Sequence, residues 1–426
     1  MMQALRTEVA IIGGGIVGAS AALFLRRRGV PVILLDAGAC GAKASGVNYG
    51  GVRRQGRSLA QMPLTQRAHE LWADLPGLIG TDGEYQRCGH LKLAYTDADM
   101  AELERYRAAT RGFGMHLEML DRAALDRRFG WLGRGVVGGS FCAEDGHANP
   151  RLVSPAFAQA ARHAGADVRE QLRVVDAARD GDGFILRCAP SASFVSSALS
   201  AIATSTATAT STATATAAAD AAGPAATLDI RARVLLNCAG AWAGGFAARF
   251  GEPVPETSIH PLMMVTEPLP RFMTASLGVQ GGGIYARQVD RGNCVIGGGR
   301  GVSSSPDYAR PGRAQIGTLL AKAAALLPPL HGAHIIRFWS GVEGNMPDHN
   351  PVLGPSVTTP GLFHAFGFSG AGFQVGPAAG EVLADLAATG RTAIPIDAFR
   401  IDRYAADAHA AALRLHTGHG QELEST

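Results

Sequence analysis

The sequence lacks closely spaced cysteines and has no large excess of charge of either sign. None of its six cysteines forms a CxxC pair, which argues against zinc ribbons and disulfide scaffolds and favours a reducing, cytoplasmic location. They are Cys40, Cys88, Cys142, Cys188, Cys238 and Cys294. The 39 basic residues nearly balance the 36 acidic ones, leaving a formal charge of +3. We therefore expect a small-molecule partner and no nucleic acid.

Long apolar runs and metal-ligand spacings are also missing. No uninterrupted apolar stretch reaches the roughly 20 residues that a membrane-spanning helix needs, which leaves peripheral membrane association open. The N-terminus lacks the basic and apolar regions of a secretory signal, so we expect none. The histidines are scattered without the spacing of zinc or iron ligands, and we expect no metal. No catalytic triad or carboxylate pair stands out.

Glycine and one long polar tract are abundant instead. Glycine supplies 55 of 426 residues, about twice its average share, so many positions are expected to need unusual backbone angles or close approach. Residues 189–227 are almost wholly Ala, Thr and Ser, and such a tract has too little large apolar surface to offset its ordering entropy. We expect a disordered insertion between strands at 183–188 and 228–236.

Helical and strand patterns alternate along the rest of the chain. The segments 9–12, 19–28 and 32–35 predict a strand, a helix and a second strand, which together form a βαβ unit. The other predicted helices are 98–111, 150–164, 313–327 and 377–388, and the other predicted strands are 88–93, 261–266, 293–297 and 362–365. At about 150 residues per domain, this mixture favours two interleaved lobes.

A GxGxxG turn follows the first predicted strand and opens the first helix. Gly13 permits a tight turn, Gly15 lets the backbone reach a pyrophosphate, and Gly18 lets helix and strand pack closely. Ile16 and Val17 lie between them at the start of the helix, where free N–H groups and the helix dipole attract an anion. The turn therefore predicts a dinucleotide site.

The next segment distinguishes between possible dinucleotides. Asp36, at the end of the second strand, provides the acceptor that a ribose hydroxyl needs. The chain then continues as loop-forming sequence over 37–57, not as a further βα unit. Ala44 and Ser45 are expected to meet phosphate or ribityl oxygens, and Asn48 to lie against a flat ring. FAD accounts for this segment better than a diffusible nicotinamide, which remains the alternative.

A second glycine-rich loop, GFSGAGF at 367–373, precedes the helix predicted to start near Pro377. Amides in such a loop are expected to face the N1/C2 edge of a flavin, where they would stabilise negative charge. The cofactor-binding residues predicted here are Gly370, Ala371, Gly372 and Phe373. The two ends of the sequence would then meet at one cofactor.

Six motifs occur along the chain in the order of a known family. They are GGGIVG at Gly13, ASGVNYGG at Ala44, EDGHANP at Glu144, LLNCAGAWA at Leu235, YARQ at Tyr285 and GFSGAGF at Gly367. Together they resemble the D-amino-acid oxidase (DAO) family of flavoproteins, which includes glycine oxidase and sarcosine oxidase. Residues 339–376 are most similar to opine-oxidase beta-subunit-like members. The resemblance implies noncovalent FAD, with Val174 near the adenine and Ala239 and Gly240 near the nucleotide.

The resemblance also implies an α/β, two-lobed architecture, in which a Rossmann-like FAD-binding domain is interleaved with a substrate domain whose antiparallel sheet roofs the flavin. The segments expected in the FAD-binding domain are 1–85, 145–188, 228–250 and 335–400. Those expected in the substrate domain are 86–144 and 251–334, and 189–227 is the disordered insertion.

Two residues depart from the family pattern. Glycine oxidase-like members carry an arginine for the substrate carboxylate where this sequence has Glu343, and related proteins often have histidine where Ala371 stands. A simple glycine oxidase is therefore not expected. Glu343 either favours a cationic or secondary-amine part of the substrate or pairs with a neighbouring arginine.

The resemblance implies oxidation of a carbon–nitrogen bond in a D-amino acid, an N-substituted glycine or an opine-like secondary amine. A hydride passes to flavin N5, and the imine then hydrolyses. A substrate carboxylate needs a cation, and the candidates are Arg287, Arg53 and Arg54, with Tyr285 as an added hydroxyl donor. Oxygen or a quinone would accept the electrons. The alternative is a noncatalytic or partner-dependent FAD subunit of a hetero-oligomeric amine or opine oxidase.

Overall fold

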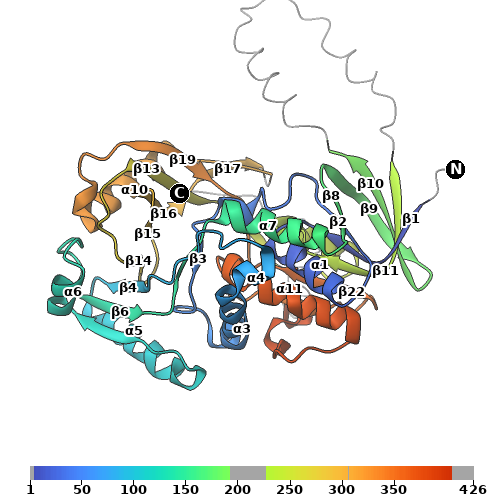
Figure 1. Ribbon diagram of the computed structural model, residues 1–426, viewed down its shortest axis with the longest axis horizontal. Helices are drawn as coiled ribbons and strands as arrows, with labels where there is room; N and C mark the ends of the chain where they lie inside the picture. The colour runs from blue at the N-terminus through green and yellow to red at the C-terminus, as the bar shows by residue number, and fades with distance from the viewer. Residues whose placement is uncertain (1–3, 192–226, 306, 405–426) are drawn as a thin grey trace, which may run out of the picture.

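The computed structural model of the protein describes residues 4–191, 227–305 and 307–404. Two eight-stranded sheets organise two lobes, with the first sheet on the right of Figure 1 and the second on the left. The first sheet has the order β21-β22-β11-β1-β2-β8, and β10 and β9 extend it from β11. This mixed α/β arrangement confirms the predicted fold class.

The N-terminal βαβ unit forms as predicted. β1 (Leu5–Ile12) and β2 (Val32–Leu35) are parallel neighbours, and α1 (Ile16–Arg27) connects them. Every residue of β2 is buried, as expected for a parallel strand covered on both faces. Gly29 follows the helix in the left-handed conformation, with a φ of +77°, which suits glycine.

Three further parallel strands build the first sheet. β8 (Asp167–Arg169) pairs with β2, β11 (Leu228–Asn237) with β1, and β22 (Leu362–Phe366) with β11. At the edge, β21 (Val352–Pro355) is antiparallel to β22. Because the parallel strands share one direction, the loops that follow them leave the sheet along one edge.

A hairpin of β9 (Leu172–Asp180) and β10 (Gly183–Pro190) lies beside this sheet, with β10 antiparallel to β11. The strands predicted on either side of the Ala/Thr/Ser tract are thus confirmed as paired neighbours. The disorder predicted for the tract concerns residues that lie outside the described ones, apart from its first three and its last.

Five helices share one apolar core with the first sheet. They are α1, α3 (Met62–Ala73), α4 (Leu75–Ile79), α7 (Pro150–His163) and α11 (Gly372–Thr389). α11 begins at Gly372, so the start predicted near Pro377 is wrong. Pro377 removes one intrahelical hydrogen bond, but α11 is buried over most of its length, and this packing outweighs the local cost.

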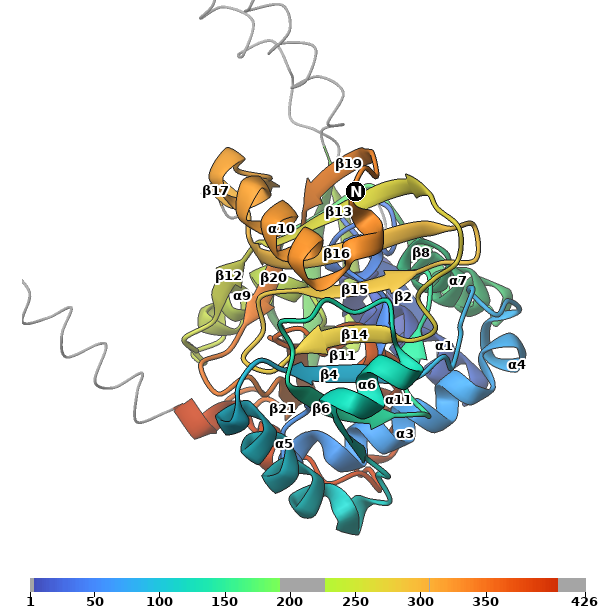
Figure 2. The same ribbon diagram turned by 90° about the vertical axis from the view of Figure 1, so that its left-hand side faces the viewer.

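The second sheet is mostly antiparallel and has the order β19-β13-β16-β15-β14-β4-β6-β5. Its strands in that order are β19 (Ile335–Ser340), β13 (Pro261–Pro268), β16 (Asn293–Arg300), β15 (Tyr285–Gln288), β14 (Ser276–Val279), β4 (His90–Ala94), β6 (Gly138–Cys142) and β5 (Glu118–Asp121). α6 (Arg122–Arg128) and α10 (Arg313–Leu326) lie across its outer face in Figure 2, where Leu125 and Leu319 join the core formed with Leu91. The opposite face carries the polar side chains of His90, Lys92 and Arg287.

The other predicted helices and strands are confirmed, including α5 (Asp97–Thr110), which begins with a capping box. Thr96 Oγ1 accepts from the Asp99 amide (3.1 Å), and the Asp99 carboxylate accepts from the Thr96 amide (3.0 Å).

The domain limits stay a prediction, and the position of β19 differs from the one that they give. β19 pairs with β13 in the second sheet, although the sequence assigns 335–400 to the FAD-binding domain.

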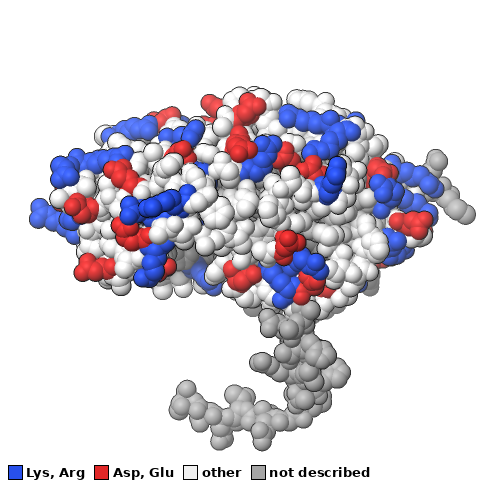
Figure 3. All heavy atoms as spheres, turned by 90° about the horizontal axis from the view of Figure 1, so that it is seen from below, with Lys and Arg blue, Asp and Glu red and all other residues white. Residues whose placement is uncertain are grey.

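The remaining elements are short. They are α2 (Ala44–Val47), α9 (Ala243–Arg249), the strand pairs β3 (Gly51–Val52) with β7 (Gly146–His147) and β12 (Thr257–Ile259) with β20 (Glu343–Asn345), and the pair β17 (Val302–Ser305) with β18 (Tyr308–Arg310). Basic and acidic side chains are interspersed over the face seen in Figure 3. Within the described ranges, no helix has the length and apolarity required to cross a membrane.

Candidate functional site

The loops that follow the parallel strands meet at one edge of the first sheet, here called the nucleotide edge. The amide of Gly13, after β1, donates to Leu35 O at the end of β2 (2.8 Å). The amide of Cys238, after β11, donates to Ile12 O at the end of β1 (2.8 Å). Ligands of open α/β sheets bind outside the carboxyl ends of the strands, so this edge is the candidate site for a dinucleotide.

The glycine turn after β1 is packed against the main chain around it. A Cβ at Gly13 would overlap with Cys238 O, and one at Gly18 would overlap with Gly13 O. Gly13 also has a φ of +102°. A Cβ at Gly15 would instead meet only the side chain of Ser45, with Oγ at 2.9 Å. Gly13 and Gly18 therefore serve packing, while Gly15 borders open space.

The start of α1 offers free hydrogen-bond donors. Its first intrahelical bond joins Ala19 N to Gly15 O (2.9 Å), so the preceding amides lie outside the helical ladder. Ile16 N donates to Ser45 Oγ (3.0 Å). The amides of Gly15 and Val17 donate to no acceptor in the part of the chain that the structure describes. Together with the helix dipole, they form a suitable anion site.

Asp36 lies just beyond β2, where its carboxylate accepts from Gly14 N and Gly38 N (2.7 Å each). Burial raises the pKa of this carboxyl, and the two amide hydrogen bonds oppose that shift. Leu172 N donates to Asp36 O (2.9 Å), so β9 begins beside Asp36 and carries Val174 two residues further on. The structure therefore places Asp36 and Val174 at the same end of the nucleotide edge.

Within the predicted loop at 37–57, the structure has a helical turn, α2, which places Ser45 at the start of α1. Asn48 ends this turn. Its Nδ2 donates to Ala44 O (3.0 Å) and Ser45 O (2.8 Å), and its Oδ1 accepts from Gly50 N (2.7 Å). The side chain of Asn48 thus fixes the path of its own loop.

α11 runs along α1 in the same direction (Figure 1). A Cβ at Gly376 would lie 2.6 Å from Ile16 Cγ2, and one at Gly380 would lie 2.5 Å from Ser20 Cβ. These contacts advance together along both helices, so the helices are parallel and their N-termini point to the same edge. Two positive dipole ends therefore face the nucleotide edge.

Amides of the loop before α11 donate to acceptors within the protein, and Ser369 N donates to Gly344 O (3.3 Å). Gly370 N donates to Glu343 Oε1, and Ala371 N donates to Phe368 O (2.9 Å). Two of the four residues predicted to present amides to a flavin therefore have these groups occupied by protein acceptors.

The first turn of α11 has amides outside the helical ladder. The first helical bond joins Val375 N to Ala371 O (3.1 Å), which leaves Gly372 and Phe373 ahead of it. The ring of Phe373 packs against Trp72, with the ring centroids 5.1 Å apart. The amides of Gly372 and Phe373 are thus the ones in this loop that precede the helical ladder.

Ala239 and Gly240 follow β11 at the middle of the nucleotide edge. Gly240 has a φ of +61°, and a Cβ there would meet no atom within 4 Å. Beside this open position lie amides at two helix N-termini and the carboxylate of Asp36. This donor set fits a dinucleotide with an anionic pyrophosphate, ribose hydroxyls and an electron-rich ring, and FAD has all three.

The polar face of the second sheet carries one continuous row of cross-strand neighbours, here called the polar row. It consists of Trp339, Met263, Gly297, Tyr285, Gly278, Lys92 and Ser140. Tyr285 and Lys92 lie on strands two apart in the sheet, with Gly278 between them. Gly278 has no side chain, and the ring of His90 lies beside this position, with Nε2 3.5 Å from the point where a Cβ would stand.

The turn at 53–57 is held rigidly opposite this row. Asp145 accepts from the amides of Arg54 (2.8 Å) and Gln55 (3.0 Å). Gln55 is fully buried, and its Oε1 lies 3.0 Å from His90 Nδ1 on β4. Burial and neighbouring cations hold the pKa of His90 well below its usual range, so its ring stays neutral.

Three cationic side chains gather at this turn. Arg53 donates to Gln55 O, and Arg57 donates to Gly370 O (3.1 Å). Burial, reinforced by the nearby arginines, lowers the pKa of Lys92 to about 8, and burial also lowers the pKa of both arginines. None of the three cations has a carboxylate oxygen within 4.0 Å among the described residues.

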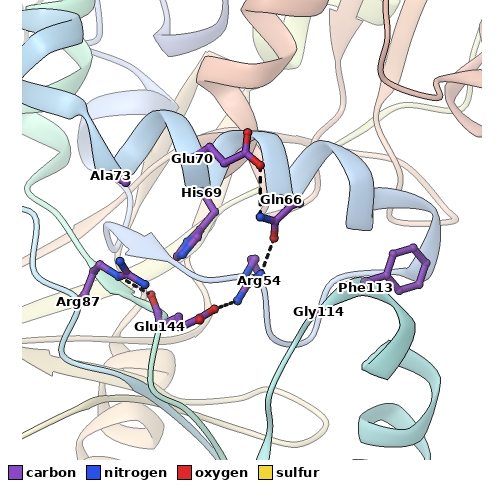
Figure 4. A pocket seen from close by; sticks show the side chains of 9 residues that line it. All are labelled: Arg54, Gln66, His69, Glu70, Ala73, Arg87, Phe113, Gly114 and Glu144. Atoms are coloured by element: carbon purple, nitrogen blue, oxygen red, sulfur yellow. Dashed lines mark hydrogen bonds and ion pairs between the residues drawn. The ribbon is translucent and has the colours of Figure 1, made fainter.

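Arg54 points elsewhere, into a separate surface pocket (Figure 4). Its guanidinium pairs with Glu144 and donates to Gln66 Oε1 (2.5 Å), and only 2% of the residue is exposed. Arg87 approaches Glu144 from the other side and donates to its main-chain oxygen (3.4 Å). The structure therefore separates Arg54 from the polar row.

Arg287 joins the second sheet to the first lobe. Its Nε donates to Tyr49 O (2.8 Å), its Nη1 lies 3.1 Å from His147 Nδ1, and the residue is 4% exposed. Tyr285, two residues earlier, packs edge-on against the Tyr49 ring at 4.9 Å. Two of the three guanidinium nitrogens of Arg287 are therefore engaged by protein groups.

Glu343 lies on β20, opposite the loop that precedes α11. Burial raises its pKa, and the hydrogen bond from Gly370 and the positive charge of Arg57 oppose that shift. The charge of Glu343 in turn contributes to the raised pKa of Tyr285. Glu343 is thus within electrostatic reach of Arg57 and Tyr285, yet no salt bridge to Glu343 occurs within the described ranges.

Sequence reasoning missed Lys92, Arg57 and Tyr106. The only signal for Lys92 was its alternation with His90 in a predicted strand, which places both on one face. Tyr106 lies on α5, and its hydroxyl accepts from the Gly56 amide (2.9 Å), a contact that no local pattern encodes.

Comparison with known proteins identifies the family. The family model described as FAD dependent oxidoreductase (DAO) matches residues 8–386. Glycine oxidase from Geobacillus kaustophilus (strain HTA426) is 27% identical over 413 residues, which cover 94% of this chain and 97% of that protein. An opine oxidase subunit from Rhizobium meliloti is 26% identical over 372 residues, which cover 84% of this chain and 87% of that protein.

Solved structures share the fold. The crystal structure of glycine oxidase from Geobacillus kaustophilus aligns with a TM-score of 0.78 at 23% identity, covering 94% of this chain and 99% of that one. L-proline dehydrogenase from P. horikoshii gives a TM-score of 0.78 at 22% identity, covering 95% and 99%. Since the family model spans most of the sequence, the chain belongs to the DAO family of FAD-dependent oxidoreductases.

Proposed function

We propose that the protein oxidises the carbon–nitrogen bond of an amino acid or secondary amine that carries a carboxylate. The observation that supports this most directly is the state of Arg53, which is near Tyr285 and Tyr49 and has one main-chain hydrogen bond but no carboxylate within 4.0 Å among the described residues. A partly buried guanidinium that has no anion in contact with it is unfavourable, and its planar fork suits a carboxylate. The proposed substrates are D-amino acids, N-substituted glycines and opine-like amines.

The proposed FAD contacts run along the nucleotide edge. The pyrophosphate would accept from the amides of Gly15 and Val17, the adenosine ribose would donate to Asp36, and the adenine would lie beside Val174. The flavin would reach the N-terminus of α11, below the polar row. This arrangement uses the free amides at both helix N-termini.

When bound, FAD would supply the two-electron acceptor for the hydride of the carbon next to a neutral nitrogen, and water would hydrolyse the resulting iminium to a carbonyl compound and an amine, with release of a proton. Arg53 holds the substrate carboxylate and so fixes the position of that carbon. The Tyr285 hydroxyl now donates to Met263 Sδ (3.4 Å), a weak acceptor, and is therefore available to a substrate oxygen. Glu343 favours the cationic, amine-bearing side of the substrate.

We propose that Arg287 acts as a positioning residue. Its hydrogen bonds hold Tyr49 and His147, and Tyr49 packs against Tyr285. The sequence-based expectation that Arg287 binds the carboxylate predicts a raised KM at unchanged stability for Arg287→Met. The positioning role instead predicts that Arg287→Met lowers the stability of the protein.

Anaerobic bleaching of the purified holoenzyme tests the proposed activity. D-amino acids, N-methyl amino acids, prolines and opines would be mixed with the protein while flavin absorbance is followed. We expect bleaching by at least one carboxylated amine, and about a 100-fold lower kcat/KM for it in Arg53→Met. Arg291→Met, at an exposed arginine, is the control. If a carboxylated amine and its amide bleach the flavin equally well, the proposed role of Arg53 is wrong.

A second candidate function is that of an FAD subunit that works only with a partner. Two relatives from Rhizobium meliloti are named as parts of larger enzymes, one as a subunit of opine oxidase and the other as the beta subunit of sarcosine oxidase. FAD bound to the isolated chain, together with no reduction by any amine in the panel, would favour this function. Recovery of reduction with a co-expressed partner would establish it.

We also propose a reducing, cytoplasmic location, supported by six free cysteines of which five are buried. The electron acceptor is proposed to be oxygen or a quinone. Oxygen uptake during turnover, compared with anaerobic reduction of a soluble quinone, distinguishes the two.

A further inference from the structure

We propose that Lys92 and Arg53 together form the clamp that binds the carboxylate of the substrate, and that Lys92 restricts the enzyme to amines bearing this group. This inference rests on the proposed function and deepens it, because it assigns a residue from the second sheet to substrate recognition. Lys92 is one of only three lysines in the chain.

The two cations border the same space. A Cβ built on Gly56, which has a φ of +79°, would lie 2.9 Å from Lys92 Nζ and 3.0 Å from Arg53 Nη1. Lys92 approaches this space from β4 and Arg53 from the turn opposite. In the polar row Lys92 and Tyr285 lie on either side of Gly278, and the Tyr285 ring extends over Gly297, with its hydroxyl 3.4 Å from Met263 Sδ.

Charge in this region is only partly balanced by the protein, because Asp145 favours the charged form of Arg53 but does not form an ion pair with it. Within the described ranges, neither Lys92 nor Arg53 has a carboxylate oxygen within 4.0 Å. Glu102 favours the charged form of Lys92, but it is exposed and already paired with Arg105. Glu343 accepts from Gly370 and lies near Arg57. Two partly buried cations that repel one another are stabilised by an anion between them.

The contact of Lys92 with Tyr106 does not replace such an anion. Lys92 Nζ lies 6.0 Å from the centroid of the Tyr106 ring, at the outer limit of a cation–π interaction. An ammonium has three donors, and a carboxylate accepts charge-assisted hydrogen bonds that are about twice as strong as neutral ones. The planar fork of Arg53 and the point charge of Lys92 can each bind one carboxylate oxygen.

Binding of an unreactive ligand tests the clamp without turnover. The probes are pyrrole-2-carboxylate and its carboxamide, titrated into FAD-loaded protein and followed by flavin difference absorbance and calorimetry. We expect Lys92→Met to weaken binding of the carboxylate about tenfold or more and to leave weak carboxamide binding unchanged. Lys92→Arg keeps the charge and should stay within about threefold of the wild type. Lys322→Met, at an exposed lysine, is the matched control.

Several results would overturn the clamp. These are an unchanged carboxylate Kd in Lys92→Met, an equal loss of carboxylate and carboxamide binding, or no carboxylate binding by the wild type. If Lys92→Met does not retain FAD, Lys92→Gln is judged by the same criteria. The bleaching panel separates this inference from the proposed function. If an amine bleaches the wild-type flavin and Lys92→Met keeps the wild-type Kd for the carboxylate, only the clamp is wrong. If the carboxylate binds but no amine bleaches the flavin, the proposed oxidation is wrong.

Discussion

The nucleotide edge and the polar row are built in different ways. The edge offers main-chain amides, and the glycines that shape it, Gly13, Gly15 and Gly18, lie within one short turn. The clamp and the row instead bring Arg53, Lys92 and Tyr285 together from distant segments. A site made of backbone can therefore be recognised in one contiguous motif, whereas a site made of side chains depends on strand pairing.

Gly15→Val should have the largest effect. The new side chain would occupy the open space in front of the free amides of α1, while its Cβ meets only the flexible Ser45 side chain. We expect FAD affinity to fall at least about 1,000-fold, equivalent to about 4 kcal/mol, with the fold retained. The ratio of FAD to protein after gel filtration and the far-UV circular dichroism spectrum measure the two quantities.

Gly245→Val on α9 is the control, because a Cβ there would meet no atom within 4 Å. It should retain FAD. If Gly15→Val also retains FAD, the pyrophosphate does not lie at the start of α1, and the nucleotide edge as described is wrong.

Arg287→Met tests the connection between the two regions. The change leaves Tyr49 O and His147 Nδ1 without their charged donor inside the protein, and each unsatisfied buried group is costly. We expect the free energy of unfolding of the holoenzyme to fall by about 3 kcal/mol, measured by urea denaturation. Arg291→Met should change it by less than about 0.5 kcal/mol. A KM increase without this loss of stability would restore Arg287 as a carboxylate ligand.

The same distinction explains what could be predicted from the sequence. The βαβ unit, the strands flanking the Ala/Thr/Ser tract and three long helices follow from local periodicity and are confirmed. The start of α11 could not be predicted from local periodicity, because Pro377 suggests a helix boundary. The buried contact with α1 stabilises the helix on both sides of Pro377. Likewise, β19 joins the second sheet through long-range pairing.

The candidate site divides in the same way. Gly13, Gly15 and Asp36 could be placed from one motif, because a glycine turn between strand and helix specifies backbone donors. Arg53 and Arg54 are adjacent in sequence, yet Arg54 pairs with Glu144 in another pocket while Arg53 borders the polar row. No local pattern distinguishes two neighbouring arginines whose partners come from other elements.

Gly380→Ala should perturb the nucleotide edge through helix packing. Its Cβ would lie 2.6 Å from Ala21 N on α1, where the main chain cannot move aside as a side chain can. Overpacking of this kind is expected to cost about 2 kcal/mol of stability. Gly376→Ala should cost less, because its neighbour is the side chain of Ile16.

Thermal unfolding of the FAD-loaded proteins measures both effects. Gly317→Ala on α10, where a Cβ would meet no atom within 4 Å, is the control and should be neutral or slightly stabilising. Equal stability of the Gly380 and Gly376 variants would show that α1 and α11 are not tightly constrained by the main chain.

Glu256→Gln should have the smallest effect near pH 4.5, and its effect on stability should depend on pH. Glu256 accepts from Gly244 N (2.7 Å) beside β20, and its other oxygen has no partner in the described residues. Burial raises its pKa from 4.5 to about 7, opposed only by that hydrogen bond. Between these pH values the folded protein holds a proton that the unfolded chain has released, so stability falls as pH rises through this window.

Glutamine cannot ionise and keeps an acceptor for Gly244, so the variant should lose this pH dependence. We expect Glu256→Gln to match the wild type near pH 4.5 and to be more stable at pH 8, where the wild-type carboxylate is buried and charged. Urea denaturation of FAD-saturated protein at both pH values measures the difference. Because all other titrating groups are common to both proteins, an equal difference at both pH values would mean that Glu256 has the same pKa folded and unfolded.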